Sequence, residues 1–261
     1  SNTITQGTDF GNLIGGTGVV RQEGTGTLVL SGTNTYTGNT VVTAGTLNIT
    51  GSLTGNPASS QLTYGTAANL ATVNVESGAD LTLFRVQGAN NANAVSIYNQ
   101  TGGTVNVGTS GTDEGGNVAF QGYGSMNLSG GSYTVNSRFT VAYNGTGGGK
   151  GVARVGGGAG SATLTAGDVL SMSRGAGSVG ELTVLANGTV NFTGTGSTNM
   201  LLIGNNANGT GYLNVVGGTF SSPTKAISFG NGTNTNASIG MVNVGAGTLE
   251  IGTDIVLFTI A

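Results

Sequence analysis

The sequence contains no cysteine, no histidine and no tryptophan, and only two of its 261 residues are proline. Without cysteine the chain forms no disulfide bond and offers no thiolate nucleophile or thiolate metal ligand. Without histidine or cysteine it cannot assemble a serine or cysteine triad of the usual kind. The near absence of proline, together with glycines that do not recur at every third position, excludes a collagen triple helix.

Charge is also scarce. Charged residues make up 7% of the chain and the formal net charge is −3, whereas an ordinary soluble domain carries about 25% charged residues. A weakly charged acidic chain has no basic surface to neutralise phosphates, so we expect no nucleic-acid partner. No run of residues approaches the roughly 18 consecutive apolar positions of a membrane helix. We therefore expect no membrane insertion of this chain.

Glycine is abundant, with 52 residues, and 36% of positions are hydrophobic, which argues against disorder. Many glycines belong to a repeated phrase, a small turn followed by an alternating strand. The copies are about 29 residues apart, a spacing typical of one coil of a solenoid. They are AGTLNI (44–49), GGTVNV (102–107), GGSYTV (130–135), NGTVNF (187–192), GGTFSS (217–222) and AGTLEI (246–251), with looser copies at SGADLTL (from 77) and AGDVLSM (from 166).

Two further alternating segments accompany most copies of the turn. One lies just before it, at 73–75, 126–128, 162–164, 213–215 and 242–244, and the other follows a variable loop, at 118–122, 139–145, 201–206 and 227–232. Alternation with a period of two predicts strands. Three short strands per coil stack on their counterparts in neighbouring coils, which predicts an all-β parallel β-solenoid of about nine three-sided coils. An antiparallel sandwich or barrel is the alternative, but the recurrence of the turn at one position favours the solenoid.

Stacked coils place equivalent residues in columns. We expect two inward columns and two outward asparagine rows, the latter forming amide ladders. The inward columns are Leu47, Val105, Tyr133, Val190, Phe220 and Leu249, and Ile49, Val107, Val135, Phe192 and Ile251. The outward rows are Asn48, Asn106 and Asn191, and, on the preceding strand, Asn74, Asn127, Asn214 and Asn243.

Residues 24–47, GTGTLVLSGTNTYTGNTVVTAGTL, closely resemble the autotransporter-associated β-strand repeat, with every fixed position matched. The resemblance implies a right-handed three-sided β-helix, secreted by a bacterium and located at the cell surface or in the extracellular matrix. No outer-membrane barrel is evident in the sequence, so we expect either a piece of a longer passenger or a free secreted subunit. We interpret residues 1–261 as one solenoid domain, with 1–23 as an N-terminal cap or first coil and 252–261 as a C-terminal strand.

The acidic residues are thinly spread, and only Asp113 and Glu114 are adjacent, within a glycine-rich loop. A solvated turn is the expected role of this pair, and a weak cation contact is the alternative. Glycoside chemistry needs clustered carboxylates. We therefore expect no enzyme, no cofactor and no metal site.

The segment 255–260 is apolar on both faces, so a strand formed by it has no polar face to expose to solvent. Three interpretations stay open: a strand buried in its own cap, the continuation of a truncated protein, or a strand that joins a second copy beside its segment 3–7. The last would form a head-to-tail homopolymer through the chain ends. The candidate subunit-contact residues are Ile255, Val256, Leu257, Phe258 and Ile260.

The leading hypothesis is a non-enzymatic extracellular β-solenoid that acts as a structural spacer, an adhesive surface or a filament subunit. Its partner would be a surface glycan, or a ligand on a host or neighbouring cell. The alternative is a β-helix that binds or degrades carbohydrate. Its candidate groove residues are Tyr98, Tyr123, Tyr133, Tyr143 and Tyr212.

Overall fold

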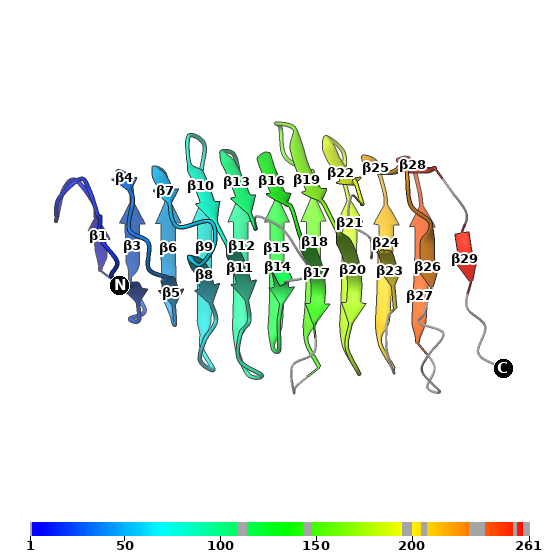
Figure 1. Ribbon diagram of the computed structural model, residues 1–261, viewed down its shortest axis with the longest axis horizontal. Helices are drawn as coiled ribbons and strands as arrows, with labels where there is room; N and C mark the ends of the chain where they lie inside the picture. Colours follow the sequence, from blue (N-terminus) through cyan, green and yellow to red (C-terminus); the bar gives the residue numbers. More distant parts are fainter. Residues whose placement is uncertain are drawn as a thin grey trace.

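A computed structural model describes residues 2–108, 114–143, 148–194, 200–204, 208–229, 238–252 and 255–257. These residues form 29 β-strands, and no helix occurs among them. The strands assemble into three sheets of ten, nine and ten strands, and all neighbouring strands within a sheet are parallel. The predicted parallel β-solenoid is confirmed (Figure 1).

We name the sheets 1, 2 and 3 in the order in which each complete coil visits them. Sheet 1 consists of β1 (Thr3–Thr5), β3 (Thr27–Leu30), β6 (Gly45–Ile49), β9 (Leu70–Val75), β12 (Val95–Gln100), β15 (Tyr123–Leu128), β18 (Lys150–Val155), β21 (Val179–Val184), β24 (Thr210–Val215) and β27 (Ile239–Val244).

Sheets 2 and 3 complete each coil. Sheet 2 consists of β4 (Thr33–Asn34), β7 (Ser52–Thr54), β10 (Asp80–Leu83), β13 (Thr104–Val107), β16 (Gly131–Val135), β19 (Ala162–Ala166), β22 (Gly188–Phe192), β25 (Thr219–Ser222) and β28 (Thr248–Ile251). Sheet 3 consists of β2 (Val20–Gln22), β5 (Thr40–Val42), β8 (Gln61–Tyr64), β11 (Arg85–Gly88), β14 (Glu114–Ala119), β17 (Arg138–Tyr143), β20 (Val169–Arg174), β23 (Met200–Ile203), β26 (Ile227–Phe229) and β29 (Ile255–Leu257).

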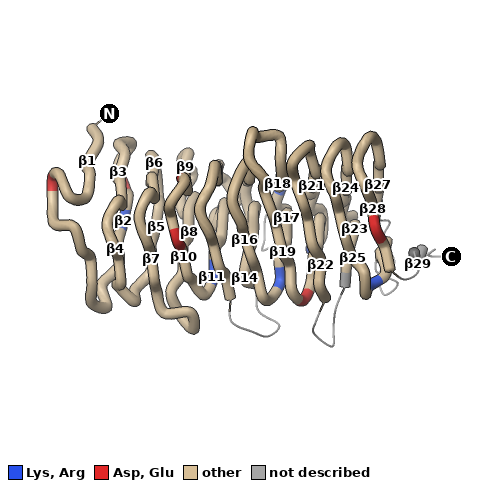
Figure 2. Tube along the Cα trace, turned by 90° about the horizontal axis from the view of Figure 1, so that it is seen from above, with Lys and Arg blue, Asp and Glu red and all other residues tan. Residues whose placement is uncertain are grey.

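Each strand of sheet 2 follows one strand of sheet 1 and precedes one strand of sheet 3, so the described strands form nine three-sided coils. An incomplete first coil precedes them and contributes β1 to sheet 1 and β2 to sheet 3. The coils stack into a rod with β1 and β29 at opposite ends (Figures 1 and 2). Ten strands at the usual spacing of about 4.8 Å give sheet 1 a width of about 43 Å.

Inward side chains of the three sheets meet in one continuous apolar core along the rod. The predicted columns in sheet 2 are confirmed where Val105 stacks on Tyr133 and where Val190, Phe220 and Leu249 follow one another. These columns are buried through most of the rod. They account for the period of two in the sequence, because every second residue of each strand faces the core.

The expected place of Leu47 and Ile49 in these columns is wrong. Both lie in β6 of sheet 1, where Leu47 is in register with Leu28 and Val73. The looser copy from residue 166 is also misplaced, because it runs into β20 of sheet 3, and the strand before it, at 162–164, belongs to sheet 2. The physical reason is that a tight glycine turn before an alternating strand serves equally well at all three corners of a coil.

A column of glycines explains part of the glycine excess. Near the start of five successive sheet 1 strands the inward residue is Gly124, Gly151, Gly180, Gly211 or Gly240. A Cβ atom at Gly151 would overlap the carbonyl oxygen of Val141, and one at Gly180 would overlap that of Met172. The backbones of sheets 3 and 1 therefore approach each other more closely at this corner than a residue with a Cβ atom would allow.

Candidate binding groove on sheet 1

The outer face of sheet 1 carries three rows of side chains, because outward residues recur at every second position of each strand. The first row, from β9 to β27, is Leu70, Val95, Tyr123, Lys150, Val179, Thr210 and Ile239. The second is Thr72, Ile97, Ser125, Val152, Glu181, Tyr212 and Met241. The third is Asn74, Asn99, Asn127, Arg154, Thr183, Asn214 and Asn243.

Asparagines of the third row form the predicted amide ladder. Asn74 donates from Nδ2 to Oδ1 of Asn48 at 2.7 Å, and Asn99 donates to Asn74 at 2.9 Å. Asn127 donates to Asn99 at 2.9 Å, and near the C-terminal end Asn243 donates to Asn214 at 2.7 Å. Each amide thus satisfies part of its hydrogen-bonding capacity through the next coil.

The expected composition of the two asparagine rows needs a correction. Asn48 belongs to the sheet 1 ladder, because β6 lies in sheet 1. Asn106 and Asn191 lie in sheet 2, where threonine or serine residues occupy the neighbouring coils: Asn106 is flanked by Thr82 and Thr134, and Asn191 by Thr165 and Ser221. Sheet 2 therefore has no stacked asparagine row.

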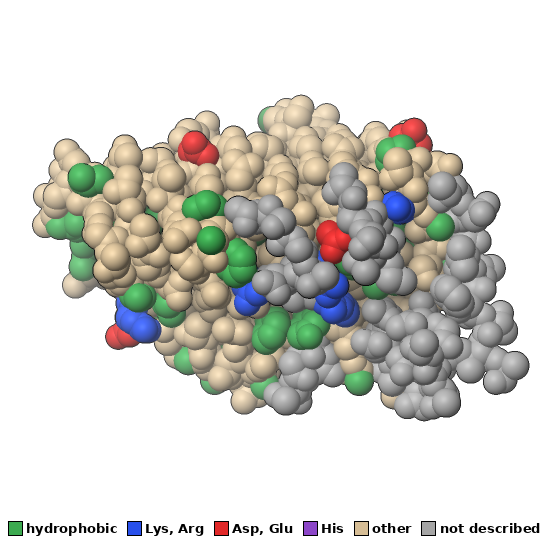
Figure 3. Space-filling view, in the orientation of Figure 1, with side chains coloured by type: hydrophobic (Ala, Val, Ile, Leu, Met, Phe, Trp, Pro, Cys, Tyr) green, Lys and Arg blue, Asp and Glu red, His purple; other side chains and the backbone are tan. Residues whose placement is uncertain are grey.

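The ladder is interrupted at β18 and β21, where Arg154 and Thr183 replace asparagine. Lys150 and Glu181 lie in the same two strands. Lys150, Arg154 and Glu181 are the only charged residues in the described strands of sheet 1. The Glu181 carboxylate is held along the sheet, because its Oε1 accepts from Thr183 Oγ1 at 2.9 Å and from Asn214 Nδ2 at 3.0 Å. Charged residues are few elsewhere along the described part of the rod (Figures 2 and 3).

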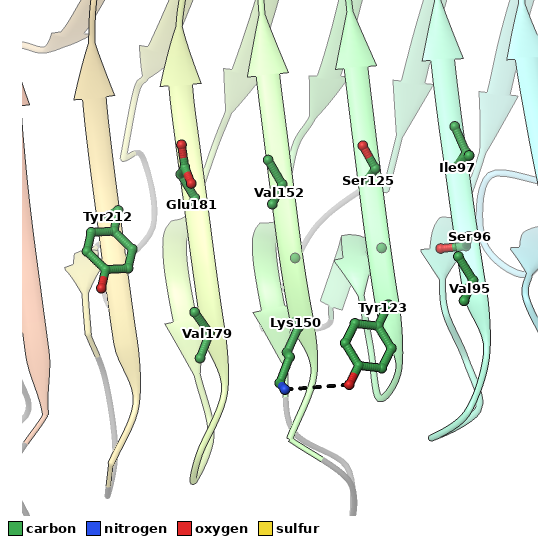
Figure 4. A pocket seen from close by; sticks show the side chains of 12 residues that line it. Val95, Ser96, Ile97, Tyr123, Ser125, Lys150, Val152, Val179, Glu181 and Tyr212 are labelled. Atoms are coloured by element: carbon green, nitrogen blue, oxygen red, sulfur yellow. Dashed lines mark hydrogen bonds between the residues drawn. The ribbon is translucent and has the colours of Figure 1, made fainter.

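A shallow groove lies over this part of sheet 1, across β12, β15, β18, β21 and β24, with a volume of about 390 Å³ (Figure 4). Its floor includes Val152 and Val179. Tyr212 stands at one end on β24, and Tyr123 stands on β15, one strand inside the other end, which Val95 and Ile97 of β12 form. The Tyr123 side chain is 51% exposed. The Lys150 Nζ atom lies 5.2 Å from the centroid of the Tyr123 ring and donates to its hydroxyl at 3.5 Å. This geometry is a cation–π contact.

Two of the five tyrosines predicted for a carbohydrate groove, Tyr123 and Tyr212, line it. The structure places the others elsewhere. Tyr98 and Tyr133 are buried in the core, with ring centroids 5.7 Å apart. Tyr143 lies in sheet 3, where it stacks on Phe120 at 5.0 Å between centroids.

Lys150 and Glu181, which line the groove, and Arg154, which lies beside it on β18, were not identified from the sequence as site residues. None of these residues belongs to a recognisable sequence motif, and the segments around them contain neither histidine nor paired acidic residues. A usable indication was present nonetheless. Aligning the coils on the row of Asn74, Asn127, Asn214 and Asn243 would have shown Arg154 and Thr183 as departures from it.

The remaining predicted site residues fall in two places. Asp113 lies outside the described residues, and Glu114 begins β14. Among the residues that the structure describes, no group of three or more acidic, histidine or cysteine side chains is arranged to hold a metal ion. The described part of the chain also has no helix long and apolar enough to cross a membrane.

At the C-terminal end, Ile255, Val256 and Leu257 form β29, which pairs in parallel with β26 of the same chain. Phe258 and Ile260 lie outside the described residues. The pairing with β26 places β29 at the last position of sheet 3, so a contact between subunits through this strand stays a prediction.

Comparison with known families gives one match. Residues 20–49 match the passenger-associated-transport-repeat, the same region in which the sequence resembles an autotransporter repeat. No curated protein and no solved structure matches the chain. The matched repeat spans β2 to β6, so it begins in the incomplete first coil and ends in sheet 1. The repeat and the three-sided parallel fold together indicate an autotransporter-passenger-like repeat protein that is secreted or displayed at a surface.

Proposed function

We propose that the chain is a non-enzymatic extracellular β-solenoid of a bacterial surface or matrix, which acts as a rigid spacer and presents the outer face of sheet 1 for adhesion. The observation that carries this proposal is the continuity of that face. Ten parallel strands stack in register, and the second and third outer rows of side chains continue from one end of the rod to the other. A ligand can therefore make repeated contacts along one straight surface.

Rigidity follows from the same stacking. Every interior strand of each sheet is paired with a strand on both sides, so bending the rod requires backbone hydrogen bonds to lengthen in all three sheets. The asparagine ladder adds side-chain bonds along the axis. Neutral outer rows favour stacking too, because identical charges placed directly opposite in neighbouring strands are destabilising.

Display of the chain on a non-adhesive bacterium, through an unrelated surface carrier, tests the adhesive part. Cells that carry the chain should bind to epithelial cells or to neighbouring bacteria more than cells with the carrier alone. Equal binding by both strains would contradict adhesion. Release of reducing sugars from common polysaccharides by the purified chain would contradict the non-enzymatic part.

A carbohydrate-binding role is the second candidate, and the groove on sheet 1 favours it. Tyr123 and Tyr212 provide ring surfaces, and Glu181 is the one acidic side chain among its described lining residues. Glycoside hydrolysis uses two carboxylates about 5–9.5 Å apart. Because the Glu181 carboxylate already accepts two hydrogen bonds within the sheet, we favour binding over degradation.

A further inference from the structure

We propose that the groove over β12 to β24 binds an acidic oligosaccharide. Lys150, which lines the groove, and Arg154, which lies beside it on the same strand, would pair with sugar carboxylates, and Tyr123 and Tyr212 would stack against the apolar faces of the sugar rings. The inference rests on the proposed adhesive function and names the chemistry of its ligand. It goes beyond the fold and the matched repeat, neither of which defines a ligand.

The first argument is the local break in the repeat. From β6 to β15 the third outer row is asparagine in every coil, and it is asparagine again in β24 and β27. Between β6 and β27, only β18 and β21 depart from it. An asparagine at this position would continue the amide ladder, so stacking alone does not account for an exposed arginine in this row. Recognition of a ligand would account for it.

The second argument is charge complementarity. Lys150 and Arg154 are both exposed, and neither forms an ion pair with a described carboxylate. They are four residues apart on the same face of β18, which separates their Cα atoms by about 13 Å. Among the described residues, the lining of the groove holds one cation, Lys150, and one anion, Glu181, and Arg154 lies beside the groove on the same strand as Lys150. Together these three residues give the described strands of sheet 1 a net charge of +1 on a chain whose net charge is −3. This face therefore attracts anions on an otherwise acidic molecule.

The third argument concerns shape and apolar surface. Tyr123 and Tyr212 lie on strands three positions apart in sheet 1, which is about 14 Å. Val152 and Val179 form the floor between them (Figure 4). A ligand that reaches both rings is longer than one sugar unit. Aromatic and apolar walls with a few placed charges are typical of small-ligand sites.

Other polyanions fit less well. An extended peptide that adds to a sheet needs a free strand edge, whereas β15, β18, β21 and β24 are each paired on both sides. A nucleic acid needs a run of cations to neutralise successive phosphates, whereas the described residues that line the groove include one cation, Lys150, with Arg154 beside it. A uronic-acid chain carries an apolar ring face and a single carboxylate in each sugar unit. It therefore matches both the tyrosine rings and the separate cations of this face.

Isothermal titration calorimetry with oligogalacturonate, and with the same oligomer fully methyl-esterified, tests the proposal. We expect the acidic oligomer to bind and the neutral ester to bind at least about tenfold more weakly, since the ester cannot form charge-assisted hydrogen bonds with the two cations. Arg154→Gln and Lys150→Gln should each weaken binding about tenfold. Tyr123→Ala should weaken it about fivefold, the loss typical of a contributing interface aromatic.

Arg21→Gln is the matched control, because Arg21 is an exposed cation of sheet 3 that lies near Glu23 and outside the groove. It should bind as the unmodified chain does. Circular dichroism spectra identical to that of the unmodified chain confirm that each variant is folded. Equal affinity for acid and ester, or no binding of the acid, would overturn the proposal. Binding of oligoglutamate that Tyr123→Ala leaves unchanged would overturn it too, as it indicates simple anion attraction.

The adhesion experiment separates the two levels of inference. If displayed cells adhere and the double variant Lys150→Gln/Arg154→Gln adheres equally, the ligand assignment fails and the adhesive function stands. If the unmodified chain confers no adhesion, the adhesive function fails, and calorimetry still reports independently on the groove.

Discussion

Asn127 donates a hydrogen bond from its side-chain Nδ2 to Oδ1 of Asn99 in the preceding coil, across 2.9 Å. Asn99 donates in the same way to Asn74. Replacing Asn99 by alanine removes both bonds, and we expect a loss of about 1–3 kcal/mol in the free energy of unfolding. Urea denaturation followed by circular dichroism measures it.

Asn106→Ala is the matched control for Asn99→Ala. Asn106 is equally half-buried, but it faces outward on sheet 2 between Thr82 and Thr134 and takes no part in an amide ladder. We expect its replacement to change stability by less than about 0.5 kcal/mol. Equal losses for the two variants would show that the ladder contributes nothing beyond the presence of an asparagine.

Gly180→Ala should destabilise the chain strongly, because the added methyl group would overlap the carbonyl oxygen of Met172 in the adjacent sheet. We expect a cost of about 3 kcal/mol, at the upper end of the usual overpacking range. Gly24→Ala is the control, since a Cβ there meets nothing within 4 Å. Thermal unfolding of the two variants should show a large fall in Tm for the first and little change for the second.

The buried tyrosines predict unfolding in alkali. Burial raises the pKa of Tyr36 to about 12 and also raises the pKa of Tyr64, Tyr98 and Tyr133 well above the ordinary value of 10. Because the folded state favours the neutral phenols, this contribution to stability is complete below pH 10 and is lost as the pH rises toward and beyond 12. Tyrosinate absorbance and circular dichroism should change together in that range.

Tyr64→Phe tests the cause of the alkaline transition. Phenylalanine keeps the ring in the core but cannot ionise, so the midpoint of unfolding should move to higher pH. The matched control is Tyr123→Phe in the groove, whose ring is about half exposed. It should leave the midpoint unchanged. A shift of the same size in both variants would contradict the role of burial.

The predicted subunit contact can be tested by deleting residues 255–261. β29 contributes three residue pairs to sheet 3, while β26 keeps its pairing with β23. We therefore expect the shortened chain to stay folded and to lose any end-to-end association of the full chain. Size-exclusion chromatography with electron microscopy measures both. A full chain that runs as a single 25.4 kDa species would contradict the head-to-tail model.

The fold was predictable because its determinants are local and repeated. Alternating apolar residues around Val105 and Tyr133 specify strands whose register is confirmed in the stacked coils. The corner to which a turn belongs was not predictable, since the phrase at 44–49 satisfies the same backbone requirement in sheet 1 that 102–107 satisfies in sheet 2. One coil assigned to the wrong corner was enough to misplace Leu47, Ile49 and Asn48.

The groove was predictable only in part. Tyrosine is a reasonable marker of a sugar site, but the sequence alone does not separate Tyr98, which the structure places in the core, from Tyr123, which starts a strand and lies on the outer face of its sheet. Lys150 comes next to Tyr123, and Glu181 next to Tyr212, only through the stacking of coils about 30 residues apart. Their proximity is a property of the register and has no counterpart in any short motif.

The register also makes the axial rise of the rod independent of the number of residues in each coil. Paired Thr27 and Thr46 are 19 residues apart, whereas paired Glu181 and Tyr212 are 31 apart. Both pairs nonetheless lie on adjacent strands, at the fixed spacing of a β-sheet. Extra residues therefore enlarge the perimeter of a coil and leave the axial rise unchanged. Insertions in the loops around the groove can alter its rim while Tyr123, Lys150 and Glu181 keep their positions along the axis.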